Sequence, residues 1–134
     1  MQGTDTEEQL RDYFSARPRG SIAVYLFGSE GRGTARPGSD VDLAVLYADE
    51  PRGTLDSPNL TLEGDLERLL GRAVQVIVLN SAPVDLVHRV LRDGRLLCEA
   101  NRSARIDFEV KARNEYFDLL PILRRYRRLE RSVS

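Results

Sequence analysis

Two short apolar runs separated by a glycine-rich polar segment constrain the fold of this chain most strongly. Residues 21–27 read SIAVYLF and residues 41–47 read VDLAVLY, and both runs are rich in the β-branched and aromatic residues that favour strands. The segment between them, GSEGRGTARPGSD, contains four glycines, which predicts a loop. The chain is therefore expected to contain two strands joined by this polar loop.

The other segments complete an alternating order of helices and strands. Pro58 at a first helical position and Gly71 after the last apolar residue bound one helix. The sequence predicts helices over 4–16, 58–70, 83–93 and from 101 onward, and further strands over 73–79 and 95–99. Apolar residues at helical spacing are the expected core of these helices: Leu10, Tyr13, Phe14, Leu62, Leu66, Leu69, Leu70, Leu86, Val87, Val90, Leu91, Ile106, Val110, Phe117 and Leu120.

This order predicts an α/β (α+β) fold, with a small mixed sheet flanked by helices. The 134 residues suit one domain over 1–134. We expect its C-terminal helix over 101–130, bent or broken at Pro121, and a frayed tail over 131–134.

Composition excludes several classes of protein. No apolar run approaches the roughly 20 residues of a membrane-spanning helix, and the acidic, polar start MQGTDTEEQL differs from a signal peptide. Cys98 is the single cysteine, so an internal disulfide is excluded, and we expect a cytoplasmic protein. The net charge of −1 argues against nucleic acid as partner. Late arginines are expected to form either a solvated helix end or a docking surface: Arg124, Arg125, Arg127, Arg128 and Arg131.

The segment between the two strands carries the candidate chemistry. Residues i and i+2 of a strand point the same way, about 6 to 7 Å apart, so Asp40 and Asp42 present two carboxylates to one site. Such a pair can hold one or two Mg²⁺ ions that keep ligand positions for phosphates. Gly28 allows close backbone approach, and Ser29 offers a hydroxyl and an amide to phosphate oxygens. Arg32, and Arg36 from the loop, can reach a phosphate.

A Gly-Ser pair followed after ten residues by Asp-x-Asp, as in Gly28, Ser29, Asp40 and Asp42, resembles the signature of the minimal nucleotidyltransferases (MNT) of the DNA polymerase β superfamily. The later segment VQVIVLNSAPVDLVHRVLRDGRLLCEA is similar to the family's second strand–helix–strand half. The resemblance implies a polymerase β-like palm, Mg²⁺ and ATP, and often an antitoxin that transfers AMP to a tyrosine of a HEPN ribonuclease toxin. The resemblance further implies that Asp40 and Asp42 are the catalytic and metal-binding residues. The residues that it implies for nucleotide binding are Gly28, Ser29, Arg32 and Ser39.

One residue departs from the family's pattern. The family usually has a third metal-binding aspartate on the next strand, where this sequence has Gln75. An amide oxygen can ligate a metal but brings no charge and cannot take a proton from an attacking hydroxyl. Three functions remain open: an adenylyltransferase acting on a HEPN partner, a weakened homologue that neutralises this partner by binding alone, and a transferase for a small molecule such as an aminoglycoside. Homo- or hetero-oligomers remain open too.

Overall fold

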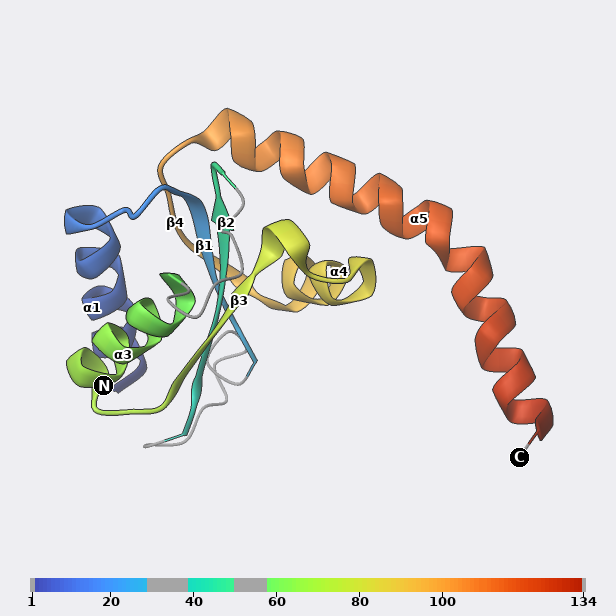
Figure 1. Cartoon of the computed structure of the whole chain (residues 1–134), viewed down its shortest axis with the longest axis horizontal. Helices are drawn as coiled ribbons and strands as arrows, with labels where there is room; N and C mark the ends of the chain where they lie inside the picture. The colour runs from blue at the N-terminus through green and yellow to red at the C-terminus, as the bar shows by residue number, and fades with distance from the viewer. Residues whose placement is uncertain (1, 29–38, 50–57, 134) are drawn as a thin grey trace.

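The computed structural model describes residues 2–28, 39–49 and 58–133. Along the chain, helices and strands alternate around one sheet (Figure 1). The elements are α1 (Gln2–Ala16), β1 (Ser21–Phe27), β2 (Val41–Tyr47), α3 (Pro58–Leu70), β3 (Val74–Val78), the 3₁₀ helix η1 (Leu79–Ser81), α4 (Val84–Asp93), β4 (Arg95–Glu99) and α5 (Arg102–Val133).

Sequence patterning predicts most of these bounds. β1, β2, α3 and β4 have the expected ends, whereas α1 begins two residues earlier and α4 one residue later. β3 is shorter than the expected 73–79 because Leu79 already belongs to η1. None of the helices in the described ranges is long and apolar enough to cross a bilayer.

The four strands form a mixed sheet in the order β3-β2-β1-β4. β2 and β3 are parallel, and β1 is antiparallel to both β2 and β4. This confirms the expected α/β fold with a small mixed sheet. Because β1 and β2 occupy the centre, they are the strands whose side chains are most completely buried.

Helices cover both faces of the sheet, and each face has its own core (Figure 1). On one face, α1 and α3 pack Leu10 and Leu66 against Val41, Leu43 and other strand residues. On the other face, α4 and the first part of α5 cover a second core, built from Ala23, Tyr25, Ala44, Leu46, Leu79, Val87, Val90 and Ala112. The alternation of side chains along β2 therefore divides its residues between two cores.

A polar network ties α5 to the sheet. The Tyr25 hydroxyl on β1 donates a hydrogen bond of 2.6 Å to Glu109 Oε2 on α5. Arg105 contacts Glu109 at 2.8 Å and also pairs with Glu99 on β4. Burial and the bond to Glu109 raise the pKa of Tyr25. This network fixes where the first turns of α5 lie on the sheet.

The buried side predicted for α5 is wrong. Ile106, Val110 and Phe117 were expected in the core but are 42%, 47% and 58% exposed, whereas Ala112 is buried. For Phe117 the physical reason is that a four-stranded sheet is shorter than this helix: α5 contacts β1 and α4 and then projects away from the sheet (Figure 1). Ile106 and Val110 lie where α5 still packs on the sheet, but there the face with Phe108 and Ala112 is the one turned to the core. Leu69 on α3 was also expected inward and is 41% exposed.

Pro121 lies inside α5, which continues as one helix to Val133 and so extends into the segment expected to fray. The helix is not broken at Pro121, although its ribbon changes direction along its length (Figure 1). A proline removes one helical hydrogen bond and favours a bend.

Candidate active site

The carboxylates of Asp40 and Asp42 point to the α4 side of the sheet. Val41 and Leu43 are fully buried on the opposite side, against α1 and α3, and successive side chains along a strand alternate between the two faces. Asp40 is exposed and Asp42 is half-buried. Burial, and next the charge of Asp40, raise the pKa of Asp42. The two carboxylates therefore repel each other, and a cation bound between them would relieve that repulsion.

Gly28 lies against the Asp42 carboxylate. The last residue of β1, Phe27, is paired with Asp42 across the antiparallel ladder, so Gly28 follows at the level of the carboxylate pair. Its φ is +68°, and a Cβ at this position would overlap Asp42 Oδ2. Only glycine combines this backbone conformation with such a close approach. The glycine that the motif singles out is therefore required by the carboxylate beside it.

Gln75 lies beside Asp42 in the parallel ladder of β2 and β3. Its neighbours Val74 and Val76 are buried on the α1 and α3 side, so the exposed Gln75 side chain shares the α4 side with Asp42. No group of three or more histidine, cysteine, aspartate or glutamate side chains among the described residues is arranged to hold a metal. The donors that remain are two carboxylates and one amide oxygen, which are all oxygen ligands of the kind that Mg²⁺ takes.

Ser39 is held by a residue that the motif did not indicate. Arg72 donates from Nε to the Ser39 carbonyl at 2.8 Å and from Nη2 to the Ser39 hydroxyl at 3.0 Å. Its Nη1 also reaches the Thr6 hydroxyl on α1 at 3.3 Å. The Val41 amide donates to the Ala73 carbonyl at 2.9 Å next to this contact. Arg72 thus anchors the start of β2, from which Asp40 and Asp42 project.

The remaining predicted residues of the site, Ser29 and Arg32, lie outside the described residues, as does Arg36. Among the predicted site residues that are described, the fold brings together Gly28, Asp40, Asp42 and Gln75. Nothing in the local sequence around Arg72 indicates its role, because it contacts a residue 33 positions away.

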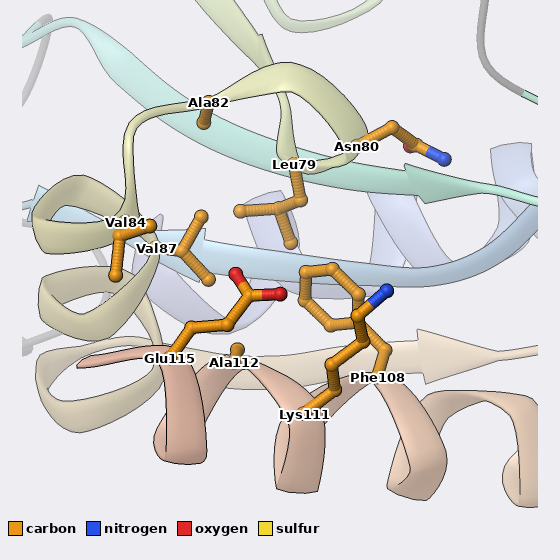
Figure 2. Close-up of a pocket in the computed structure, with 9 residues that line it drawn as sticks. All are labelled: Leu79, Asn80, Ala82, Val84, Val87, Phe108, Lys111, Ala112 and Glu115. Atoms are coloured by element: carbon orange, nitrogen blue, oxygen red, sulfur yellow. The ribbon is translucent and has the colours of Figure 1, made fainter. Parts of the chain in front are cut away.

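A separate pocket lies at the opposite end of the sheet. It has a volume of about 220 Å³ between η1, α4 and α5, and Phe108, Lys111 and Glu115 of α5 form one side of it (Figure 2). Asn80, also in its lining, exchanges two hydrogen bonds with the Tyr47 backbone at the end of β2. Because Asp42 lies near the start of β2, this pocket is not part of the carboxylate site.

The sequence of this chain is similar to proteins of known function. The family model described as polymerase beta, nucleotidyltransferase matches residues 8–103. A protein adenylyltransferase, MntA of Shewanella oneidensis, is 39% identical over 75 residues, which are 55% of this chain and 51% of that protein. The matched region thus spans about half the length of this curated relative.

Two solved structures resemble the whole chain. A crystal structure of a toxin–antitoxin with AMP-PNP contains a chain with a TM-score of 0.77 and 26% identity, covering 96% of this chain and 98% of that one. A complex of the tri-AMPylated HEPN toxin of Shewanella oneidensis with an MNT antitoxin gives a TM-score of 0.73 at 24% identity, covering 100% of both chains. Because the family model extends over the whole sheet and the carboxylate pair, the chain belongs to the polymerase β nucleotidyltransferase family.

Proposed function

We propose that this protein is a Mg²⁺-dependent nucleotidyltransferase that transfers AMP from ATP to a tyrosine of a HEPN-family partner and thereby acts as the antitoxin of that partner. The observation that carries the proposal is the pair Asp40 and Asp42 on one face of the sheet, with Gly28 packed against Asp42. The relatives support it: one is named a protein adenylyltransferase, one was solved with AMP-PNP, and one is in complex with an AMPylated HEPN toxin. We propose the cytoplasm, where ATP is available, as the site of the reaction.

Each residue of the site has a part in this proposal. Asp40 and Asp42 would hold Mg²⁺, with the Gln75 oxygen as a neutral third donor, and the ion would supply positive charge that offsets the charge of the phosphates. Gly28 leaves room for the Asp42 carboxylate at the end of β1, and Ser29 and Arg32 would contact the phosphates of the nucleotide.

In the proposed transfer, the tyrosine oxygen forms a bond to the α-phosphorus and the bond between this phosphorus and the β-phosphate oxygen breaks. Pyrophosphate leaves, and AMP remains on the tyrosine. The phenolic proton goes to water, because Gln75 is an amide and takes no proton. Loss of a general base costs on the order of 10²-fold in rate, so we expect slow transfer.

Gln75 also favours a second function, neutralisation of the partner by binding alone. If Gln75 abolishes turnover, the protein would neutralise its HEPN partner by binding alone. This alternative needs a surface for the partner but no chemistry at Asp42.

α5 offers such a surface. Beyond its contacts with the sheet, Ile122, Tyr126 and Leu129 are 60%, 66% and 57% exposed, and their spacing of three and four residues places them on one helix face. We name these three residues the α5 stripe. Exposed arginines flank it: Arg124, Arg125, Arg127 and Arg128. The structural likeness to chains of toxin–antitoxin complexes includes α5, since it covers 96% to 100% of this chain. We propose that the HEPN partner covers the α5 stripe.

One experiment separates these functions. The purified protein is incubated with Mg²⁺, ATP and a HEPN-family protein from the same genome, and the intact mass of both proteins is measured. AMP on the partner that is absent with the double variant Asp40→Asn/Asp42→Asn supports the transferase. A stable complex without AMP transfer supports neutralisation by binding. Neither transfer nor a complex would contradict both.

A further inference from the structure

A second pocket opens next to Gly28, between the end of β1 and α4. Its volume is about 230 Å³, and Phe27, Gly28, Leu86, Arg89, Val90 and Asp93 line it. Because Gly28 also touches the Asp42 carboxylate, this pocket adjoins the carboxylate site. Its charged lining residues both come from α4.

The two charged residues of this pocket differ in their partners. Asp93 Oδ1 and Oδ2 each accept a hydrogen bond of 2.9 Å from Arg92, so a neighbouring guanidinium compensates the Asp93 charge. Arg89 is exposed and forms no hydrogen bond or ion pair with the rest of the described chain. Among the residues that the structure describes, the pocket therefore carries one cation without a protein partner.

α4 packs closely against the end of β1. A Cβ at Gly94, the residue after α4, would lie 2.6 Å from the Val90 carbonyl oxygen, 3.0 Å from the Leu26 carbonyl oxygen and 3.1 Å from Phe27 Cβ. The Gly94 amide also donates to the Val90 carbonyl at 2.8 Å. This close approach keeps the backbone of Arg89, one helical turn earlier, next to Gly28.

We propose that Arg89 binds a phosphate group of the nucleotide. A polyphosphate that approaches Asp40 and Asp42 meets two negative charges, and fixed cations nearby offset this repulsion. A guanidinium presents several N–H donors that match phosphate oxygens. The inference rests on the proposed nucleotide site and adds to it a residue outside the Gly-Ser and Asp-x-Asp segments.

Binding of two ligands by calorimetry in the presence of Mg²⁺ tests the inference. ATP contains base, sugar and phosphates, whereas tripolyphosphate contains the phosphates alone. We compare the wild-type protein with Arg89→Ala, Arg89→Lys and the control Arg113→Ala, which removes an exposed arginine of α5. Circular dichroism and thermal melting verify that each variant is folded.

We expect Arg89→Ala to weaken ATP and tripolyphosphate binding by about tenfold each, as for loss of a hydrogen bond to a charged group. Arg89→Lys should lose less affinity for both ligands, and Arg113→Ala should bind them as the wild-type protein does. Unchanged binding by Arg89→Ala, or weakening for ATP alone, would overturn the phosphate contact while leaving the nucleotide site in place. If the wild-type protein binds neither ligand, both this inference and the proposed function are wrong.

Discussion

Gln75 on β3 lies beside Asp42 on β2, at the same level of the parallel ladder and on the same side of the sheet. An amide thus stands next to the carboxylate whose pKa is raised by burial and by Asp40. A carboxylate in place of Gln75 would strengthen the repulsion in the metal-free protein. Because the Gln75 amide is neutral, it adds no third negative charge to this part of the fold. For the same reason it cannot act as a base in the site.

Replacing Gln75 with aspartate should accelerate AMP transfer. Gln75→Asp adds a proton acceptor and an anionic ligand, and we expect a gain on the order of 10²-fold in the transfer rate. Single-turnover kinetics with saturating partner would measure it. The double variant Gln75→Asp/Asp42→Asn serves as the control and should be inactive. An unchanged rate would show that the third carboxylate is not what limits this protein.

Asp42→Asn should stabilise the metal-free protein at neutral pH. The pKa of Asp42 is higher in the folded state than in the unfolded chain. The folded chain therefore holds this proton more tightly, and the free energy of unfolding falls as the pH rises from the unfolded to the folded pKa. Removing the charge should therefore raise the free energy of unfolding at a pH above that range.

Thermal melts in EDTA and in Mg²⁺ would check the Asp42→Asn prediction. Mg²⁺ should raise the melting temperature of the wild-type protein and leave that of Asp42→Asn nearly unchanged, because a ligand stabilises only the state that binds it. The two proteins should differ little at a pH below the unfolded pKa. Equal stabilisation of both by Mg²⁺ would place the metal elsewhere.

Gly28→Ala should impair the site more than the matched variant Gly20→Ala. Both glycines have positive φ, +68° and +77°, but a Cβ at Gly20 meets nothing within 4 Å. Each substitution should cost about 1 to 2 kcal/mol of stability for the left-handed backbone. Only Gly28→Ala displaces the Asp42 carboxylate, so it alone should abolish Mg²⁺-dependent ATP binding. Equal ATP affinities in the two variants would contradict this.

Arg72→Ala should destabilise the start of β2. The substitution removes the bonds to the carbonyl and hydroxyl of Ser39 and to Thr6, and we expect a loss of about 2 kcal/mol in the free energy of unfolding. Denaturant titration would measure it. Ser39→Ala keeps the contact between Arg72 and the Ser39 carbonyl, so its free energy of unfolding should fall by less than half as much. A neutral Arg72→Ala would mean that these bonds do not anchor β2.

Polar substitution of the α5 stripe should weaken partner binding without unfolding the protein. Tyr126→Ser and Leu129→Ser lie where α5 projects beyond the sheet, so we expect stability changes within about 0.5 kcal/mol. Affinity for the HEPN partner should fall tenfold or more, as at interface positions that contribute about 2 kcal/mol. The control is Ile106→Ser, also exposed, near the start of α5. Wild-type affinity in the stripe variants would exclude this surface, and loss of a dimer of the protein alone would assign it to self-association.

Signals that act within a few residues account for the helix and strand bounds that could be predicted from the sequence. Periodicity, Pro58 and the glycines after the helices act within a few residues, so they define the ends of β1, β2, α3 and β4. The buried faces of α1 and most of α3 follow from spacing alone, since both helices pack against the same core of the sheet. The same reasoning fails for Phe117, because periodicity does not reveal how much of a 32-residue helix a small sheet can cover.

By itself, the sequence determined the mixed α/β pattern, the Gly28 turn and the shared direction of Asp40 and Asp42, because two-residue alternation is a property of a single strand. Only the tertiary structure decided which residues lie beside that pair. Strand register brings Gln75 to Asp42, the α4 packing brings Arg89 to Gly28, and Arg72 reaches Ser39 across 33 positions of chain. Such neighbours depend on how separate segments pair and pack, and this is a property of the whole fold.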